Sequence, residues 1–405
     1  MLNFPLGVWV KKRFDSNEFA WTPPLPPWSS RRARQVRRIR TVARAAMRRR
    51  LVAEHGWLYV LGISCAWPAV ALMKAVVHGR STSQTGLPRV LNQWWLQLAH
   101  NLGIGEQQDF RTDRPEQRAR VPLYVADTEH RFLMAYLNRD AQPERVRDKI
   151  PFARFCAQHG LPTVAVLAES EGAGRPAQRR APLPPTDLFL KPAALWGGQG
   201  ACRIAYVAAD RSWRADDGTR LGPETVAAYA DSLFPGLSWV LQPCLSNGPA
   251  WAKFSPGGLC TVRVVTGRVS PDAPPEVIGG FMRFPRRGAV VDNMSTGGWG
   301  ADYDADGRMG PVRSLDPDSP ASDRHPDTGE LIQGVVIPEW ERVSALARRA
   351  HGLISNIAMI GWDVALPGTE PVLIEANTNW GVLVDTPLGE TRYVEILAQP
   401  CWRCF

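Results

Sequence analysis

The stretch from residue 361 to residue 381, GWDVALPGTEPVLIEANTNWG, constrains the fold of this chain more than any other. Two apolar segments, 362–366 and 371–377, flank the turn-forming sequence PGTE and predict a β-hairpin. Acidic residues are uncommon in β-strands, yet each predicted strand contains one, Asp363 in the first and Glu375 in the second. The register of the hairpin therefore decides what this pair of acids can do.

The predicted register places both acids on one face. If Leu366 pairs with Val372, Asp363 stands directly opposite Glu375, with Cβ atoms about 5 Å apart. Asn377 follows Glu375 by two residues and shares its face. Two carboxylates and an amide oxygen, with no Lys or Arg in the stretch, suit Mg²⁺, which completes its shell with phosphate oxygens and water. A surface hairpin with solvated acids explains the same spacing, so the hairpin alone leaves both interpretations open.

The length and composition indicate a globular protein with more than one domain. The 405 residues suffice for two or three domains, and 44% hydrophobic and 21% charged residues are typical of globular chains. The net charge of +9 is concentrated, because ten arginines and no acid lie between Arg31 and Arg50, which leaves the other 385 residues with a net charge of −1. Seven scattered cysteines, an odd number, indicate reduced thiols and a cytoplasmic location.

The N-terminal part divides by composition. Residues 1–30 are rich in proline and predict a disordered tail, and residues 31–80 predict helical structure that is first basic and then apolar. Residues 57–73 contain no charge. They fit a membrane-spanning helix with the arginines on the cytoplasmic side, a helix in the membrane surface with the arginines on anionic lipid, or a buried helix. Nucleic acid is not expected, because the arginine run lacks interleaved aromatic residues and a recognisable fold.

A helical region is predicted over residues 81–147, followed by the main domain over 148–399 and a short tail over 400–405. Asp148 is the predicted cap of the first helix of that domain. The segment 187–206 predicts a strand, Lys191, a glycine loop and a second strand. A glycine loop lets backbone N–H groups approach a phosphate closely, although an ordinary turn explains this one equally well.

An arginine within an apolar strand is the next signal. The segment 259–265, LCTVRVV, predicts a strand with Arg263 in its middle, and such an arginine usually faces a ligand or a buried acid. Further strands are predicted at 122–127, 163–168, 277–283 and 289–293.

Seven short segments, taken in order, resemble the ATP-grasp fold and more narrowly the sugar-transfer-associated ATP-grasp family, which is related to D-alanine–D-alanine ligases and glutamate ligases. These segments are DLFLKP, LQPCLSN, TVRVVTG, DNMSTGG, HPDTG, GWDVA and IEANTNWG, and the resemblance covers roughly residues 80–395. It implies an α+β fold in which two α+β subdomains clamp ATP, here with a helical, basic N-terminal extension. One of these subdomains is a lid over about residues 187–245.

The resemblance also implies roles for individual residues. Phosphate contacts are implied for Lys149 and Lys191, a contact with the γ-phosphate and the acceptor for Arg263, and two Mg²⁺ ions on Asp363, Glu375 and Asn377. The remaining ATP-binding residues implied are Gly197, Gly198 and Gly200 in the lid, Gln242, Pro243, Cys244 and Leu245 in an adenine-binding hinge, and Asn247 near the ribose. Candidates near the acceptor substrate are Asn293, Ser295, Gly297, Gly298, His325, Asn379 and Trp380.

One position departs from the family pattern, since Trp380 stands where the related ligases usually have proline. The implied activity is an ATP- and Mg²⁺-dependent carboxylate–amine ligase that works through an acyl-phosphate on a glycan, an amino acid or another small molecule of cell-surface polysaccharide synthesis. The alternatives are a phosphotransferase with the same nucleotide site and a non-catalytic nucleotide-binding protein. A cytoplasmic location is expected, with a peripheral position on the inner membrane face through the run from Arg31 to Arg50.

Overall fold

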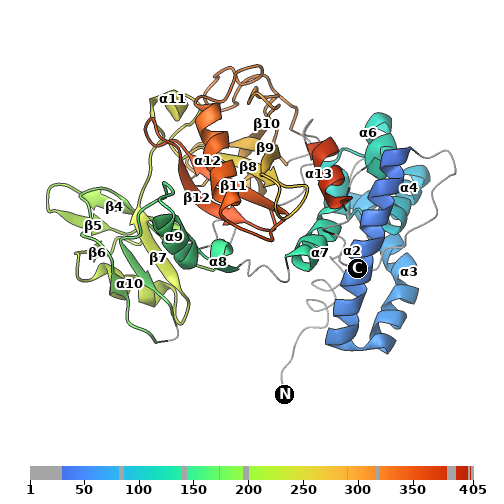
Figure 1. Cartoon of the computed structure of the whole chain (residues 1–405), viewed down its shortest axis with the longest axis horizontal. Coiled ribbons are helices and arrows are strands. Elements are labelled where there is room, and N and C mark those ends of the chain that lie inside the picture. The colour runs from blue at the N-terminus through green and yellow to red at the C-terminus, as the bar shows by residue number, and fades with distance from the viewer. Residues whose placement is uncertain are drawn as a thin grey trace. The chain divides into compact units, whose positions relative to one another are not determined.

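The computed structural model divides into two compact units, whose elements are labelled in Figure 1. The helical unit contains the described residues up to 138 together with those from Asn379 onward. The second unit is Ala141–Thr378. The structure describes residues 30–81, 86–123, 125–138, 144–172, 174–194, 200–289, 291–315, 319–380, 389–399 and 402.

The helical unit begins with two long helices joined by a single residue. The Ser30 hydroxyl accepts the N–H of Ala33 at 3.1 Å and caps the first helix. Gly56, with φ of 83°, separates that helix from the next and gives the chain a backbone angle that favours glycine. The elements of the unit are α2 (Arg31–His55), α3 (Trp57–Ser81), α4 (Leu87–His100), α5 (Ile104–Asp109), α6 (Pro115–Arg120), η1 (Val121–Leu123), α7 (Asp127–Leu137) and α13 (Gly389–Leu397).

Helix α2 buries part of its positive charge. Arg44 donates from Nε to Glu129 Oε1 at 2.8 Å, and Arg40 Nε lies 3.1 Å from Glu129 Oε2. Arg40 also contacts His100 Nδ1 at 3.0 Å. Burial, which outweighs the neighbouring Glu129, lowers the pKa of Arg40, and burial beside Arg40 lowers the pKa of His100 to about 3. The run predicted to face a membrane is therefore partly structural. Its exposed arginines are Arg31, Arg34, Arg38, Arg48, Arg49 and Arg50.

Helix α3 is the one described helix that is long and apolar enough to cross a membrane, judged by length and composition alone. The candidate segment is Trp57–Val77, and only 22% of its most apolar window is buried. The buried-helix interpretation of residues 57–73 is therefore wrong for most of these side chains. The buried minority packs against α2 and α4 through Val60, Trp67 and Ala71.

The second unit contains two antiparallel sheets. The strand order is β2-β1-β7-β3-β4-β5-β6 in the first sheet and β10-β9-β8-β11-β12 in the second. The first sheet consists of β1 (Ala168–Ser170), β2 (Gln178–Arg179), β3 (Leu188–Pro192), β4 (Cys202–Val207), β5 (Ser212–Arg214), β6 (Arg220–Leu221) and β7 (Trp239–Pro243). The second consists of β8 (Thr261–Gly267), β9 (Glu276–Phe284), β10 (Trp299–Asp302), β11 (Met359–Ala365) and β12 (Val372–Asn377).

Helices cover both sheets. Helix α12 packs on β8, β9 and β11, as Figure 1 shows, and α10 buries Val226 and Ala230 against the first sheet. The first helix after the predicted cap begins at Lys149, and Asp148 Oδ1 accepts the N–H of Ile150 at 3.0 Å, so the predicted cap is confirmed. The helical elements of this unit are α8 (Glu144–Arg147), α9 (Lys149–Gln158), α10 (Val226–Leu233), α11 (Pro249–Ala252), η2 (Met294–Thr296) and α12 (Trp340–Gly352).

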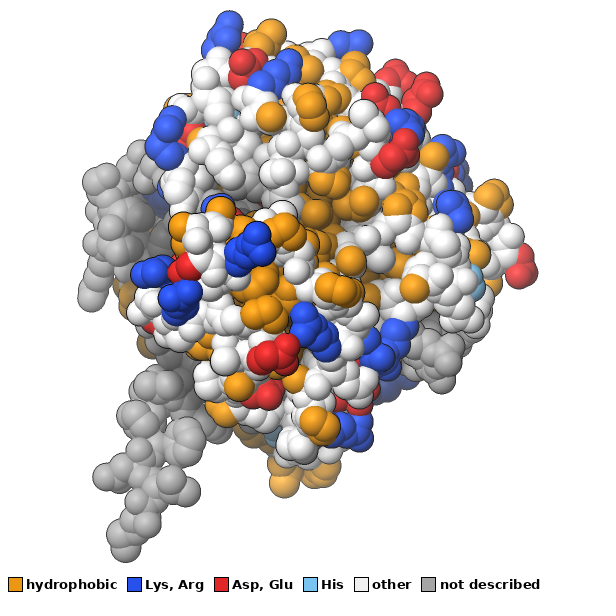
Figure 2. Space-filling view, turned by 90° about the vertical axis from the view of Figure 1, so that its left-hand side faces the viewer, with side chains coloured by type: hydrophobic (Ala, Val, Ile, Leu, Met, Phe, Trp, Pro, Cys, Tyr) orange, Lys and Arg blue, Asp and Glu red, His pale blue; other side chains and the backbone are white. Residues whose placement is uncertain are grey.

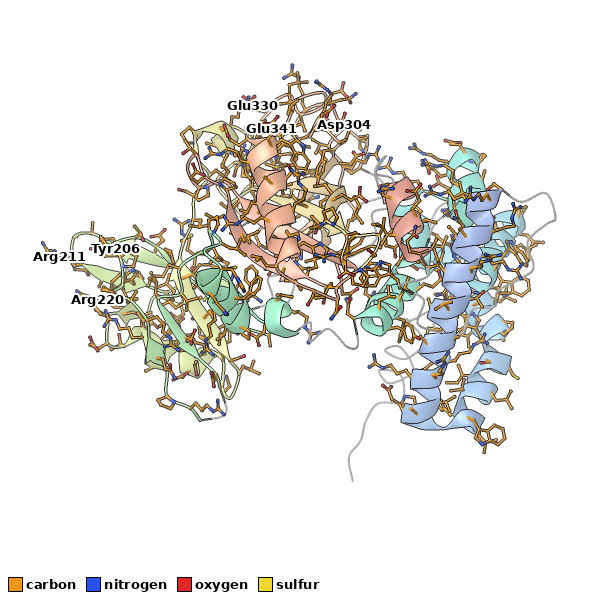
Figure 3. All side chains as sticks on the ribbon, viewed as in Figure 1. Tyr206, Arg211, Arg220, Asp304, Glu330 and Glu341 are labelled. Atoms are coloured by element: carbon orange, nitrogen blue, oxygen red, sulfur yellow. The ribbon has the colours of Figure 1, made fainter. Side chains whose placement is uncertain are left out.

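Outer turns of the second unit are closed by local hydrogen bonds. Asp304, labelled in Figure 3, accepts the N–H of Asp306 at 3.0 Å and that of Arg308 at 2.9 Å. Arg211, also labelled there, adopts φ of 51° in the turn between β4 and β5. The side shown in Figure 2 interleaves hydrophobic and basic side chains with small groups of acids. The five cysteines that the structure describes are free thiols.

Three predicted strands are wrong. Residues 121–123 form a 3₁₀ helix rather than part of a strand over 122–127. The described residues of 289–293 form no strand. Within 163–168, Thr163 makes only an isolated bridge to Leu373, and the strand of this region begins at Ala168.

Candidate functional site

The predicted pairing of the two hairpin acids is confirmed. In β11 and β12, Asp363 stands directly opposite Glu375. The route differs from the prediction, because Ala365 rather than Leu366 pairs with Val372. A register shift between Asp363 and Val364 compensates for that one-residue difference, so the acids still face each other.

Asn377 completes the predicted oxygen set. Its Nδ2 donates to Glu375 Oε1 at 3.1 Å, which places the amide beside the acid two residues earlier on β12. Asp363 is buried, whereas Glu375 and Asn377 are half-buried. Glu375 also interacts with the Asp363 carboxyl and contributes to lowering its pKa. The hairpin therefore presents three oxygen-bearing side chains to one small region of the unit.

Two buried arginines hold Asp363 in its charged form. Arg263 lies opposite Asp363 on β8 and donates from both Nε and Nη2, the latter to Oδ2 at 3.1 Å. Arg283 of β9 places Nη2 at 2.8 Å from the same Oδ2. Burial alone raises the pKa of Asp363, but the two guanidinium groups outweigh it and hold this pKa well below its usual range. The sequence prediction that Arg263 faces a buried acid or ligand is confirmed for the acid.

Arg283 is a site residue that the sequence analysis missed. It donates from Nε and Nη2 to Thr261 Oγ1 at 2.9 and 2.6 Å, and Thr261 in turn donates to Asp292 Oδ2 at 2.5 Å. Burial, partly offset by Arg283, raises the pKa of Asp292. The pKa of Arg283 is raised because Asp292, Asp363 and Glu375 together outweigh its own burial. The signal was available, since Arg283 ends a predicted apolar strand just as Arg263 interrupts one.

Glycine permits the close packing behind Arg263. A Cβ on Gly280, which pairs with Val264, would lie 1.9 Å from the Arg263 carbonyl oxygen and 2.1 Å from the Tyr303 hydroxyl oxygen. That hydroxyl lies 2.9 Å from the Arg263 oxygen and 3.0 Å from the Gly279 oxygen. Gly280 also has φ of 149°, so only glycine fits without displacing the strand that carries Arg263.

Both predicted lysines interact electrostatically with Glu375. Lys149, the first residue of α9, donates from Nζ to the Ala193 carbonyl at 3.3 Å. Lys191 of β3 is buried and interacts electrostatically with Glu375, Lys149 and Asp363. Burial is the largest cause that lowers the pKa of each lysine, and it brings that of Lys191 to about 8. Four cationic side chains, those of Lys149, Lys191, Arg263 and Arg283, thus interact electrostatically with the acids of the hairpin.

The predicted adenine-binding hinge lies at the end of β7, the strand between β1 and β3. Gln242 is buried and its Nε2 lies 3.4 Å from the Val164 carbonyl oxygen. Pro243 ends the strand, and Cys244 donates its N–H to the Asp187 carbonyl at 2.8 Å just before Leu245. Burial raises the pKa of the Cys244 thiol.

Asn247 has a structural role in this loop. Its Nδ2 donates to the Gly258 carbonyl at 2.7 Å, and its Oδ1 accepts the Cys260 N–H at 2.8 Å. Both ends of the amide are engaged within the protein, which accounts for Asn247 without a ribose contact. In the glycine loop, Gly200 has φ of 71°, while Gly197 and Gly198 lie outside the described residues.

The predicted acceptor residues separate into two groups. In the first, the N–H of Gly298 donates to the Asn293 carbonyl at 3.0 Å across η2, which includes Ser295. A Cβ on Gly298 would lie 2.5 Å from the Asp292 carbonyl oxygen, which explains the glycine. The neighbouring Gly297 has φ of 96°. The loop therefore directly follows Asp292, the acid that pairs with Arg283.

His325 braces its own turn beside this loop. Its Nδ1 accepts the N–H of Asp327 at 3.1 Å and that of Thr328 at 3.3 Å, which assigns the proton of the neutral ring to Nε2. Burial lowers the pKa of His325. Asp327 accepts the Arg287 N–H at 3.1 Å and the Trp299 Nε1–H at 3.4 Å. Asp327 therefore connects the turn of His325 to Arg287 and Trp299, which flank the loop of residues 293–298.

Asn379 and Trp380 form the second group and belong to the helical unit. Trp380 is buried, with its ring centroid 4.6 Å from that of His130 and 5.8 Å from that of Tyr393. His130 Nδ1 and the Tyr393 hydroxyl lie 2.7 Å apart. This packing accounts for Trp380 without a contact to the acceptor substrate. The neighbouring Asn379 is exposed.

The two sheets and the charged cluster define an ATP-grasp protein, and comparison with known proteins agrees. Residues 128–392 match the family model described as sugar-transfer associated ATP-grasp, so this chain belongs to that family. A search of the curated proteins finds no match.

Among solved structures, the chain is similar to three ATP-grasp relatives, all at low identity. The L-amino acid ligase from Bacillus licheniformis is 11% identical over 64% of this chain and 48% of its own, with a TM-score of 0.35. The D-alanine–D-alanine ligase from Bacillus anthracis, complexed with ATP, is 10% identical over 63% and 65%, with a TM-score of 0.34. The biotin carboxylase from Campylobacter jejuni is 14% identical over 63% and 47%, with a TM-score of 0.33. The chain thus spans less than two thirds of each relative's length.

Proposed function

We propose that this protein is an ATP-dependent carboxylate–amine ligase that forms an acyl-phosphate. The observation that carries the proposal is the convergence of Lys149, Lys191, Arg263 and Arg283 on the hairpin acids. A triphosphate and a carboxylate bring several negative charges together, and a buried group of cations beside paired acids can neutralise them. Membership of the ATP-grasp family supports the nucleotide as the ligand.

The lysines are proposed to bind the ATP phosphates, while Arg263 and Arg283 orient the γ-phosphate and the acceptor carboxylate. The hinge at Gln242, Pro243, Cys244 and Leu245 is proposed to bind adenine, and Gly200 belongs to the covering loop. Because the site is buried, each charge contact is stronger than it would be in water.

Mg²⁺ is proposed to bind Asp363, Glu375 and Asn377. The donor set fits, because two carboxylates and an amide are hard oxygen ligands and Asp363 stays charged at all physiological pH values. No group of three or more His, Cys, Asp or Glu residues able to hold a metal occurs among the described residues, so the set depends on the amide and on ligand oxygens. Two bound Mg²⁺ ions would supply charge neutralisation to the transferred phosphoryl group.

The proposed reaction has two steps. An oxygen of the substrate carboxylate bonds to the γ-phosphorus as the bond to the β-phosphate oxygen breaks and ADP leaves. The amine nitrogen then bonds to the acyl carbon, phosphate leaves with the electron pair of the acyl–oxygen bond, and the amine loses a proton to solvent. The family description names only an association with sugar transfer. We propose as substrate a glycan or another small molecule of cell-surface polysaccharide synthesis, or an amino acid. Because ATP is the co-substrate, we propose a cytoplasmic location.

The test is ADP release by the full-length protein with Mg²⁺ and ATP, screened against pairs of carboxylic acids and amines. Amino acids, amino sugars and carboxy sugars are the compounds to try. A ligase releases ADP steadily only when both an acid and an amine are present. Steady release with a single hydroxyl compound would instead identify a phosphotransferase. Nucleotide binding, seen as a thermal shift, without release under any combination would identify a non-catalytic protein, and either outcome contradicts the proposal.

The pH dependence of nucleotide binding tests the role of Lys191. Its pKa of about 8 in the free protein means that it is charged at pH 7 and mostly neutral at pH 9.5. A bound phosphate favours the charged form, so ADP affinity should fall as pH rises, by about 30-fold between these values. Calorimetric titration without metal measures the change.

The matched control for the pH dependence is Lys191→Arg, whose guanidinium stays charged throughout. Its ADP affinity should vary by less than about threefold over the same interval. An undiminished decline in this variant would assign the titration to another group and contradict the role given to Lys191.

A further inference from the structure

The outer surface of α3 is apolar between Trp57 and Met73. Between Trp57 and Met73, the exposed positions of this helix carry no polar side chain. Trp57 is 64% exposed and Leu58 67% exposed, values unusual for large apolar side chains that gather on one element. The exposed residues of this stretch are Trp57, Leu58, Leu61, Gly62, Cys65, Ala66, Ala69, Leu72 and Met73.

Helix α4 is also apolar on its exposed side. It packs along α3, with Trp94 Nε1 donating to the Pro68 carbonyl at 2.8 Å and Gln97 Nε2 donating to the Ala71 carbonyl at 3.1 Å. Its own exposed large side chains are again apolar, namely Leu87, Leu91 and Trp95. We call the exposed apolar side chains of α3 and α4 the apolar face.

The charge around the apolar face is mainly positive, although α5, which packs against α3 and α4, carries the half-buried Glu106. Neither α3 nor α4 contains an acidic residue. Arg48 and Arg49 are exposed in the last turns of α2, within ten residues of the start of α3. The one acid of α2, Glu54, is paired with Arg50 at 2.7 Å. A partner that covers this region must therefore bring both apolar surface and negative charge.

We propose that the apolar face docks on an anionic lipid bilayer, a surface separate from the nucleotide site and independent of its function. Acyl chains match the face, and anionic headgroups match the exposed arginines. Trp57 at the basic end of α3 has the chemistry of a side chain at the headgroup level. A second copy of this chain meets only the first requirement, because it brings further positive charge.

The packing of α3 places it in the membrane surface rather than across it. The inner side of α3 holds Val60, Trp67 and Ala71 against α2 and α4. A spanning orientation would draw the buried amides of Gln93 and Gln97 and the arginines of α2 into hydrocarbon, at a large cost. The α3–α4 pair can instead lie flat, with its outer side in the lipid and its polar partners in water.

The test is flotation of the full-length protein with vesicles of phosphatidylcholine alone or mixed with phosphatidylglycerol. Binding is expected to the mixed vesicles, to be weakened by salt, and to be released by alkaline carbonate. The double variant Leu61→Asp/Met73→Asp should bind at least about tenfold more weakly. A matched control, Leu237→Asp/Leu331→Asp, changes two leucines of similar exposure in the other unit and should bind normally.

A second arm keeps the proposal testable if the first variant does not fold. Arg48→Gln/Arg49→Gln should weaken binding to phosphatidylglycerol vesicles about 30-fold. Three results would overturn the proposal: no vesicle binding by the folded protein, resistance to carbonate extraction as for a spanning helix, or a dimer that Leu61→Asp/Met73→Asp dissociates while lipid binding is absent.

Discussion

Glu375→Gln is expected to slow ADP release by on the order of 10²–10³-fold while the protein stays folded. The substitution removes one proposed Mg²⁺ ligand charge at a half-buried position. The new amide keeps the size of the side chain and can still accept from Asn377 Nδ2, as Glu375 does at 3.1 Å. The free energy of unfolding should therefore fall by less than about 1 kcal/mol, which the midpoint of thermal unfolding measures.

Asp363→Asn should lower the activity similarly but also destabilise the fold. It would leave Arg263 and Arg283 buried without the carboxylate that now pairs with both. Breaking one side of a buried ion pair costs about 3–5 kcal/mol, which thermal unfolding would show clearly. The contrast between these two neighbouring acids separates the metal role from the structural role.

Glu370→Gln is the matched control for both substitutions. Glu370 lies in the turn of the same hairpin, with its side chain 70% exposed, and pairs with the exposed Arg342. Neither activity nor stability should change measurably. Normal turnover by Glu375→Gln would contradict the metal assignment, and unchanged stability of Asp363→Asn would contradict the buried pairing.

The hairpin could be predicted from local patterns in the sequence. A turn sequence between two apolar segments sets the facing residues to within a residue, and a side-chain period of two then places Asn377 beside Glu375. The register shift after Asp363 was not predictable, because it arises from how β11 pairs with both β8 and β12 at once. The pairing of Val372 differs by one residue from the prediction, and the register shift restores the predicted pairing at Asp363 and Glu375.

Arg283 also follows the rule that an arginine in an apolar strand faces a ligand or a buried acid, although its sequence context hides this. Apolar residues flank Arg263 on both sides, whereas Arg283 is followed closely by Arg286 and Arg287, which resemble a solvated basic turn. The structure shows that Arg283 points to the same carboxylate as Arg263. Thr261 and Asp292, which support it, carried no distinguishing local pattern.

Contacts between distant segments set the limit of sequence reasoning here. Trp380 packs against His130, which lies 250 residues earlier, and this partner gives the tryptophan a packing role that no local pattern reveals. Similarly, Arg40 and Arg44 belong to a run that looks uniformly solvated. Their burial depends on Glu129, and Glu129 lies 85 residues after Arg44.

Glu129→Gln is expected to lower the free energy of unfolding by about 3–5 kcal/mol. Its carboxylate is the shared partner of Arg40 and Arg44, and all three side chains are at most 5% exposed. Without it, two guanidinium groups would remain buried at close range with their shared counter-charge gone. Urea unfolding followed by circular dichroism of the helices measures the loss.

Two further variants separate charge from packing. Glu54→Gln, which breaks the exposed pair with Arg50, should change stability by less than about 1 kcal/mol. The triple variant Arg40→Met/Arg44→Met/Glu129→Leu should recover most of the loss, because a well-packed apolar group can replace a buried ion cluster. If Glu129→Gln unfolds like the unaltered protein, these arginines are hydrated rather than buried, and all ten arginines of α2 become available to a membrane. A large loss instead confines lipid contact to the exposed arginines, which makes Arg48 and Arg49 the decisive positions for docking.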